Sequence, residues 1–478
     1  MRKFISFPVE DLVLFKTNLL HWASSFSKCC VLDSNHYHDN KNELIAAVGC
    51  IDELLPQENS FAALKKFHAE KKDWLFGHLS YDLKNETEKL SSDNFDGVEF
   101  PQMHFFCPKY IVRLSSPHSP ARTTVQSGGP LSPRPNDSSG RAKGREPGQR
   151  GVVEIGFLPE LSSEKEVNGV LSALLNSSVP SALSHLPSAI HSRLSKAEYI
   201  RTIEKIKQHV HRGDIYELNY CMEFFFEKAE IDPLEIFLRL NGTSQTPFSS
   251  FYRMGDKYLL CASPERFLKK TGNKIISQPI KGTSKRGRNV SEDTESAENL
   301  FASEKEKSEN VMIVDLVRND LSRCCDNVKV DELCGVYTFK QWHQMVSTVS
   351  GELRANVHFT DLIKNTFPMG SMTGAPKVKA MELIEKYEKT KRGLYSGAVG
   401  YITPQGNFDF NVVIRSILHN ASSGYLSFQV GSAITANSIP ENEYEECLLK
   451  AKGMFSALSV ENYTSQETNS KEYRNSLV

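Results

Sequence analysis

A lysine in an apolar segment is the residue of this sequence with the clearest potential for chemistry. Lys281 lies in the stretch SQPIKGTSKRG, between a Pro-Ile pair and a Gly-Thr pair. An ammonium group that loses its water there is unfavourable unless it is paired, or unless its pKa falls so that the neutral amine can act as a nucleophile. The neighbouring charges of Lys285 and Arg286 favour the neutral form. We therefore expect residues 277–287 to form a tight turn that holds a nucleophilic amine.

Glu265 is a candidate proton carrier for that amine. It belongs to the stretch CASPERFL and lies sixteen residues before Lys281, a separation that a β-hairpin can close by folding back on itself. A carboxyl group beside a nucleophilic amine can carry its proton. The local sequence equally allows a turn residue that pairs with Arg266 or faces solvent, and both interpretations stay open.

Two helical stretches carry glutamates that could bind a metal ion. Glu309 lies in SEKEKSENVMIVDLVRNDLSR, on the same helical face as Ile313 and Asp320. Taken alone, this helix is explained more simply by a first-turn glutamate that complements the helix dipole. In ENEYEECLLKAKGMFSAL, Glu446 and Lys450 are spaced as i and i+4. They could form a surface ion pair, or Glu446 could be the second carboxylate of an oxygen-ligated Mg²⁺.

Two further features suit an anionic ligand. Arg415 lies in NVVIRSIL with apolar residues on both faces of a predicted buried strand, where a guanidinium needs an anion or a structural ion-pair partner. The stretch PMGSMTGAPKVKAMELIEKYEK places Gly370 and Gly374 before a helix with Pro376 in its first turn. Free amides at such a helix start can bind an anion, although a plain glycine-rich helix entry is more common.

Helices and antiparallel strands must position these residues. From about Ser195, amphipathic stretches such as KAEYIRTIEKIKQHVHRGD alternate with apolar runs such as SSFYRMGDKYLLCAS. Towards the end of the chain the pattern predicts three antiparallel strands, joined by turns at PQGN and ASSG, over residues 396–403, 408–420 and 425–435. This arrangement is typical of an α+β fold.

Composition predicts five parts of the chain. Residues 115–151 are rich in Ser, Pro, Gly and Arg and almost empty of large apolar side chains, so we expect a disordered low-complexity insertion there. The other parts are an N-terminal part of the fold over residues 1–114, a connecting segment over 152–194, a catalytic core over 195–460 and a flexible tail over 461–478.

The overall charge excludes some functions. The chain has 57 Lys and Arg against 58 Asp and Glu, so nothing global indicates binding to nucleic acid or to an anionic membrane. No stretch reaches the roughly 18 consecutive apolar residues of a membrane span, and the N-terminus lacks the pattern of a secretory signal. The ten cysteines are scattered without a C-x-x-C pair, which is typical of reduced thiols in a cytoplasmic protein and argues against a thiolate zinc site.

Taken together, these segments resemble the chorismate-utilising enzymes, the family of anthranilate synthase component I, aminodeoxychorismate synthase component I, isochorismate synthase and salicylate synthase. The resemblance covers about residues 195–458 and runs in one order through GDIYELN, SPERFL, PIKGT, ENVMIVDLVRNDL, GSMTGAPKVKAMELI, YSGAVGY, VVIRS and EYEECLLKA. It implies a large antiparallel β-sandwich with outer helices, like that of anthranilate synthase component I.

Within this family, the residue after Pro-Ile distinguishes two activities. Anthranilate synthases characteristically have alanine there, as in PIAGT, and aminodeoxychorismate synthases have the lysine of PIKGT. The resemblance therefore implies the conversion of chorismate and ammonia to 4-amino-4-deoxychorismate, with Lys281 as the covalent nucleophile and Glu265 as the proton donor.

The resemblance also assigns expected roles to further residues and partners. It implies Mg²⁺ held by Glu309 and Glu446, with Glu306 as a further acid in the metal region. Residues expected to contact the substrate are Arg415, Tyr395, Gly431, Ser371, Lys450 and Thr283. A separate glutaminase subunit, component II, is expected to supply the ammonia, because the chain has no G-x-C-x-G nucleophile segment of a glutamine amidotransferase.

One position departs from the family pattern. Many relatives have a histidine two residues before the Val-Ser of H-L-V-S, whereas this chain reads WHQMVST, with Gln344 at that position and His343 one residue earlier. Glutamine cannot act as a general acid, so either the reaction does not need one there or His343 replaces it through a register shift. Two other functions stay open: anthranilate synthase component I, and a non-catalytic subunit that binds chorismate or a glutaminase. The buried charges speak against the non-catalytic subunit.

Overall fold

The computed structural model describes residues 1–37, 43–115, 151–176, 189–460 and 463–465. The predicted disordered insertion, residues 115–151, lies outside the described residues except for its two end residues, as does most of the predicted flexible tail.

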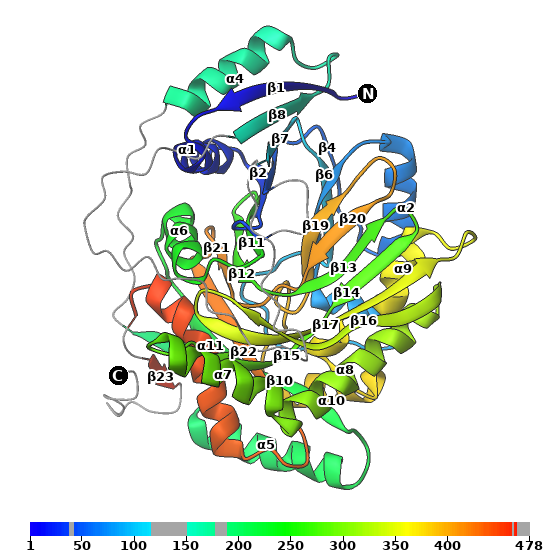
Figure 1. Ribbon diagram of the computed structural model, residues 1–478, viewed down its shortest axis with the longest axis vertical. Coiled ribbons are helices and arrows are strands. Elements are labelled where there is room, and N and C mark those ends of the chain that lie inside the picture. The colour runs from blue at the N-terminus through cyan, green and yellow to red at the C-terminus, as the bar shows by residue number, and fades with distance from the viewer. Residues whose placement is uncertain (38–42, 116–150, 177–188, 461–462, 466–478) are drawn as a thin grey trace.

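Two large, almost entirely antiparallel sheets form the centre of the molecule (Figure 1). The larger sheet has 13 strands within the described residues, in the spatial order β1 (Lys3–Val9), β8 (Gly151–Phe157), β7 (Tyr110–Ser115), β3 (Leu44–Val48), β2 (Lys28–Asp33), β11 (Phe248–Met254), β12 (Lys257–Ser263), β21 (Ser416–Asn420), β22 (Tyr425–Ile434), β10 (Glu217–Phe226), β9 (Ile190–Ser192) and β23 (Tyr463–Ser465), with β18 (Gly374–Ala375) paired to β10. The described part of the smaller sheet has 10 strands, in the order β15 (Ile280–Lys285), β17 (Trp342–Leu353), β14 (Lys274–Gln278), β13 (Arg266–Thr271), β20 (Phe408–Asn411), β19 (Ala398–Ile402), β5 (Leu75–Leu79), β6 (Met103–Cys107) and β4 (Asp52–Leu54), with β16 (Cys325–Thr338) paired to β17. Among these pairs, β9 and β23 run parallel.

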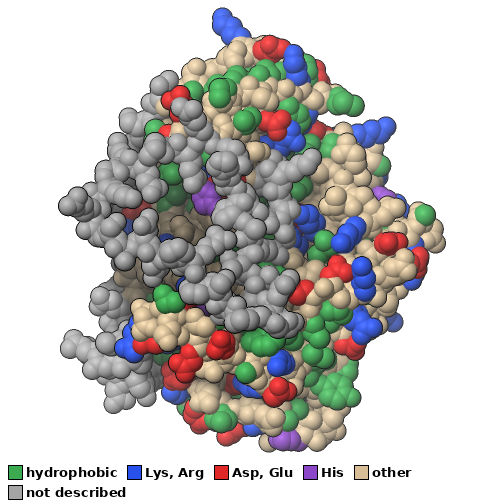
Figure 2. Space-filling view, viewed as in Figure 1, with side chains coloured by type: hydrophobic (Ala, Val, Ile, Leu, Met, Phe, Trp, Pro, Cys, Tyr) green, Lys and Arg blue, Asp and Glu red, His purple; other side chains and the backbone are tan. Residues whose placement is uncertain are grey.

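Helices lie around the two sheets, as Figure 1 shows for α4, α2, α9, α5 and α6 at the outside of the molecule. Their bounds are α1 (Leu12–Ser24), α2 (Ser60–Lys71), α3 (Lys84–Thr87), α4 (Glu164–Asn176), α5 (Lys196–His211), α6 (Pro233–Ser244), α7 (Val290–Ala302), α8 (Glu304–Ser322), α9 (Phe359–Thr366), α10 (Lys377–Tyr387) and α11 (Pro440–Ala457), with short 3₁₀ turns η1 (Tyr81–Leu83) and η2 (Gly370–Met372). Every helix with a described structure is too short or too polar to span a bilayer. Acidic and basic side chains are interspersed over the visible face (Figure 2), in agreement with the nearly balanced charge.

Strand β10 of the larger sheet is buried on both faces, which explains its long apolar run. In β10, Tyr220 and Phe224 belong to a core shared with α1, α5, α6 and α11, whereas Cys221 and Phe225 belong to a second core between the two sheets. Because side chains alternate along a strand, a strand between two apolar layers has no polar face. The predicted α+β sandwich with outer helices is therefore confirmed.

Helix α8 joins the sheets to the region of the predicted site. Its N-cap Ser303 accepts a hydrogen bond from the backbone of Glu306, and Ile313 and Val317 are buried in the core between the sheets. Val311, on the opposite side of this helix, is 47% exposed. The buried face therefore fixes the helix with its first-turn glutamates at the edge of the sandwich.

The chain crosses from one sheet to the other where a single strand was predicted. Residues 408–420 form β20 in the smaller sheet and β21 in the larger sheet, separated by Val412–Arg415. Arg415 has φ 51°, a left-handed conformation outside the extended range of a regular strand. The prediction of an arginine inside one continuous strand is therefore wrong, because both segments are equally apolar and the pattern carries no mark of a change of sheet.

Candidate active site

A cavity of about 670 Å³ lies where the two sheets approach each other, within the size range of small-molecule sites. It is lined by residues from β15, β22, α8 and α11 and from the segments around them. All eleven residues singled out from the sequence line it, namely Lys281, Glu265, Arg415, Tyr395, Gly431, Ser371, Lys450, Thr283, Glu309, Glu446 and Glu306. The structure thus brings the set together, while the role of each residue stays a prediction.

Lys281 projects from a strand, which corrects the predicted tight turn. It lies in β15, whose pairing with β17 is irregular between Ile280 and Thr283. At this bulge Gly282 has φ 94°, and a Cβ there would lie 3.0 Å from Glu306 Oε2. Asn310 Nδ2 donates to the Lys281 carbonyl at 3.3 Å. The bulge and this hydrogen bond fix the backbone from which the lysine side chain enters the cavity.

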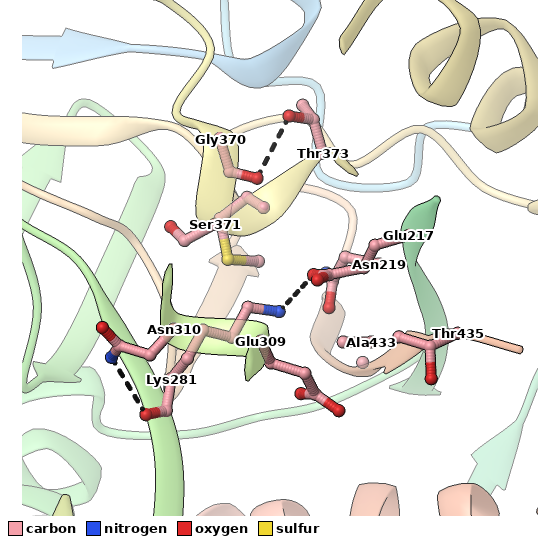
Figure 3. A network of polar contacts seen from close by, with 12 residues as sticks. Glu217, Asn219, Lys281, Glu309, Asn310, Gly370, Ser371, Thr373, Ala433 and Thr435 are labelled. Carbon is pink, nitrogen blue, oxygen red and sulfur yellow. Dashed lines mark hydrogen bonds and ion pairs between the residues drawn. The ribbon is translucent and has the colours of Figure 1, made fainter. Parts of the chain in front are cut away.

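The Lys281 amine is paired with a carboxylate that the sequence did not single out (Figure 3). Its Nζ donates to Glu217 Oε1 at 2.6 Å. Burial alone would lower the pKa of Lys281, but the carboxylates of Glu217, Glu309 and Glu446 raise it above its ordinary value. The predicted lowering of this pKa by neighbouring cations is therefore wrong. Arg286 is instead paired with Asp293, so the acids around the amine dominate.

Glu265 is a buried carboxyl group at the wall of the cavity. It follows β12, and β13 and β14 form the predicted hairpin between it and Lys281. Its side chain accepts a hydrogen bond from Ser371 Oγ at 2.6 Å, and burial raises its pKa to about 7. Arg266, the partner that the local sequence offered, donates to Asp409. A carboxyl group with this pKa can both give and take a proton near neutral pH.

Three glutamates of the cavity offer oxygen ligands. Burial raises the pKa of Glu309 to about 7 and also raises the pKa of Glu306. Burial opposes the ionisation of Glu446, but the charge and hydrogen bond of Lys450 lower the pKa of that carboxyl. Within the described residues, three or more acidic, His or Cys side chains do not come together as a ready-made metal cluster. Two carboxylates facing one cavity nevertheless fit Mg²⁺, which commonly takes one or two carboxylates together with water and an anionic substrate.

The other side of the cavity carries groups for an anion. The Arg415 guanidinium lies over the Trp342 ring, 5.9 Å from its centroid, and burial lowers its pKa. Tyr395 is 4% exposed and lines the same cavity. In the described part of the chain, Arg415 has no acidic side chain within ion-pair distance, so its charge is available to a ligand.

Gly431 and Lys450 form a second fixed element of the wall. Lys450 Nζ donates to the Gly431 carbonyl at 2.8 Å and is 2.7 Å from Glu446 Oε1. A Cβ on Gly431 would lie 2.5 Å from Cys221 Sγ, so a larger residue cannot replace this glycine without displacing β10. Lys450 therefore connects the larger sheet to the predicted metal ligand.

The register of β17 settles which residue of WHQMVST faces the cavity. Trp342 and Gln344 line it, whereas His343 points away, with Nε2 3.0 Å from Asp293 and Nδ1 hydrogen-bonded to Thr338. The alternative in which His343 replaces the family histidine through a register shift is therefore not observed.

Sequence reasoning missed two glutamates. Glu217 opens the apolar run ELNYCMEFFF, and a charged residue on a strand buried on both faces was a usable signal. Glu443 lines the cavity one helical turn before Glu446, and its pKa is raised by burial and by Glu446. The i, i+3 spacing of these two glutamates could have identified it.

Comparison with known proteins shows the family to which the chain belongs. Residues 29–456 match the family model for chorismate binding enzymes. The chain is 39% identical over 263 residues to aminodeoxychorismate synthase component 1 of Salmonella typhimurium, covering 55% of this chain and 57% of that protein. It is 38% identical over 269 residues to the chloroplastic aminodeoxychorismate synthase of Arabidopsis thaliana, covering 55% of this chain and 29% of the relative. It is also 36% identical over 390 residues to an anthranilate synthase component I-like protein of Synechocystis, covering 80% of this chain and 72% of that protein.

The fold agrees with a solved structure. Anthranilate synthase component I from Streptococcus pneumoniae superposes with a TM-score of 0.69 at 23% identity, covering 87% of this chain and 93% of that chain.

The matched span is less than two thirds of the length of the Salmonella and Arabidopsis relatives. The family model, in contrast, extends over nearly the whole described chain. The chain belongs to the family of chorismate binding enzymes.

Proposed function

We propose that this chain is the chorismate-converting component I of an aminodeoxychorismate synthase. It would form 4-amino-4-deoxychorismate from chorismate and ammonia, for the synthesis of para-aminobenzoate and folate. The observation that carries the proposal is the placement of the Lys281 amine and the Glu265 carboxyl in one cavity. The names of the Salmonella and Arabidopsis relatives support it.

Two steps account for the reaction. The neutral Lys281 amine attacks C2 of chorismate, the double bond shifts, and the C4 hydroxyl leaves as water with the proton of Glu265. Ammonia then adds at C4 and expels the lysine from C2, and Glu265 recovers a proton from the new amino group. Because burial raises the pKa of Glu265 to about 7, this carboxyl retains a proton for the first step near neutral pH.

The remaining residues bind and orient the substrate. Arg415 and Tyr395 would hold the enolpyruvyl carboxylate, because a guanidinium forks onto a carboxylate. Ser371, whose hydroxyl donates a hydrogen bond to Glu265, would keep the Glu265 carboxyl directed at C4. Gly431, Thr283 and Lys450 would form the wall around the ring.

Glu309 and Glu446, with Glu306 beside them, are the residues that would hold Mg²⁺. The ion would neutralise charge, since the substrate brings two carboxylates to a pocket already rich in carboxylates. Their carboxylate oxygens support this assignment, and burial raises the pKa values of Glu309 and Glu306, so a cation that neutralises these two acids would bind favourably there.

The ammonia would come from a separate glutaminase subunit, component II, forming a heterodimer. The ten cysteines are all free, which supports a cytoplasmic location in which thiols stay reduced.

The test is chorismate consumption by the purified chain with ammonium chloride and Mg²⁺, followed by product identification. We expect a product that has gained nitrogen and kept its enolpyruvyl group. Lys281→Ala should lower this activity by at least about 10³-fold, because a covalent nucleophile has no substitute. Lys274→Ala, an exposed lysine on β14, is the matched control and should leave the activity unchanged.

Anthranilate synthase component I is the second candidate, favoured by the Synechocystis relative. It would release pyruvate and fluorescent anthranilate without an added lyase. Pyruvate release by the purified chain would refute the proposed reaction, and undiminished turnover in Lys281→Ala would refute the covalent mechanism.

A further inference from the structure

The Lys281 amine is a poor nucleophile as the structure holds it. Its Nζ is 2.6 Å from Glu217 Oε1, which is its ion-pair partner in the part of the chain that the structure describes. Glu309 and Glu446 raise the pKa of the amine further, and Glu265 and Glu306 also face it across the cavity. A protonated amine has no lone pair with which to attack carbon. Covalent catalysis therefore requires a group that takes one proton from Lys281.

Glu217 is placed to take that proton. It is 1% exposed and begins β10, where the backbone of β18 pairs with it on one side. Its Oε1 receives the Lys281 hydrogen bond, and its Oε2 is buried without a hydrogen-bond partner among the described residues. An unpartnered carboxylate oxygen in the interior costs stability, so a structural role alone explains it poorly.

The strand supplies an internal comparison. Glu223 lies on the same strand, is also buried, and is paired with Arg193 and Tyr425 through both of its oxygens. Glu217 by contrast faces the reactive lysine with one oxygen and leaves the other free. Glu223 therefore shows how this strand satisfies a buried carboxylate that has a structural role.

We propose that Glu217 is the general base that removes a proton from the Lys281 ammonium before the amine attacks C2 of chorismate. The inference rests on the proposed covalent function. One N–H bond of Lys281 breaks and one O–H bond of Glu217 forms, so the pair becomes a neutral amine and a neutral acid. When ammonia expels the lysine, the amine leaves without an extra proton, and the neutral pair is ready for the next substrate or returns to the ion pair.

Replacing Glu217 by glutamine separates this role from simple ion pairing, because the two make opposite predictions. If Glu217 merely stabilises the ammonium, Glu217→Gln lets Lys281 lose its proton more easily, and the variant is as fast as the wild type or faster. If Glu217 is the base, the variant is slower although its lysine is the stronger acid. The expected loss in kcat at about pH 7 is on the order of 10²-fold, with KM for chorismate unchanged.

The pH profile gives the second readout. In Glu217→Gln the rate should rise about tenfold per pH unit above neutrality, because the lysine must then lose its proton to solvent. The wild type and Glu217→Asp, which keeps a carboxylate, should lack this rise. The acidity of Lys281 can be measured without turnover, from the pH dependence of its acetylation by acetic anhydride, followed by peptide mass spectrometry.

The outcomes separate the two proposals. Wild-type turnover of Glu217→Gln with an unchanged pH profile overturns the role of Glu217, even if Lys281→Ala is inactive. Wild-type turnover of Lys281→Ala overturns the covalent function itself. The thermal unfolding of Glu217→Gln, compared with that of Glu223→Gln on the same strand, shows whether the variant is folded. If Glu217→Gln does not fold, a Glu217→Asp enzyme with the steep pH dependence overturns the proposal, and one with the wild-type profile supports it.

Discussion

Replacing Glu265 by glutamine should remove the proton donor and also stabilise the fold at neutral and alkaline pH. Glu265 is 4% exposed, and burial raises its pKa from 4.5 to about 7. The folded protein therefore keeps a proton on this carboxyl at pH values where the unfolded chain has released it. Ionisation favours the unfolded chain, so this group's contribution to stability is complete below pH 4.5 and is lost as the pH rises to about 7.

The size of the effect follows from the two pKa values. The interval from 4.5 to about 7 corresponds to about 3 kcal/mol, at about 1.36 kcal/mol for each pKa unit. Glutamine has the same shape, stays neutral, and keeps the carbonyl oxygen that accepts the hydrogen bond of Ser371 Oγ. Between about pH 5 and pH 8, the free energy of unfolding of Glu265→Gln should therefore rise by about 2 kcal/mol relative to the wild type.

Urea unfolding at both pH values measures this difference, since subtraction of the wild type cancels the other titrating groups. Glu298→Gln on α7, where the side chain is exposed, is the control and should show no pH-dependent difference. Chorismate consumption should fall on the order of 10²-fold in Glu265→Gln. A stability difference that is constant or shrinks with rising pH would refute the reasoning, because the carboxyl would then ionise in the fold as easily as in the unfolded chain.

Two further predictions test the walls of the cavity. Gly282→Ala should destabilise the protein by about 1–3 kcal/mol, because residue 282 has φ 94° and its Cβ would meet Glu306. Urea unfolding measures the change, and Gly242→Ala on α6, where a Cβ meets nothing, is the control. Equal urea midpoints for Gly282→Ala and Gly242→Ala would contradict the strain. Glu446→Gln should raise the Mg²⁺ concentration for half-maximal chorismate consumption by at least about tenfold; an Mg²⁺ titration like that of Glu298→Gln would exclude the ligand role.

The fold class could be predicted from the sequence, and so could the set of residues that line the cavity. The period of 3.6 residues showed on which helical face Glu309 lies, and the short separation of Glu265 and Lys281 allowed a hairpin between them, but both patterns left simpler alternatives open. The family resemblance, carried by eight motifs in one order, selected these residues for the site. Short-range patterns of this kind can be recognised without knowledge of the tertiary structure.

What could not be predicted depends on contacts between distant segments. Lys281 and Glu217 lie in different sheets, and nothing local indicates that these strands face each other. The direction of the Lys281 pKa shift was therefore misjudged, since the adjacent Lys285 and Arg286 were visible in the sequence and the surrounding acids were not. The change of sheet at Arg415 was hidden for a similar reason, because both of its flanking segments are equally apolar.

The Lys281–Glu217 contact joins the two layers of the sandwich at the point where they enclose the cavity. Lys281 belongs to the smaller sheet, and Glu217 and Gly431 belong to the larger one. The cavity is lined from both layers, so a substrate that contacts Lys281 on one side and the Gly431 wall on the other would link the layers in place of this ion pair. Occupancy of the cavity is thereby coupled to the cohesion of the whole sandwich, and the free energy of binding appears as resistance of both sheets to unfolding.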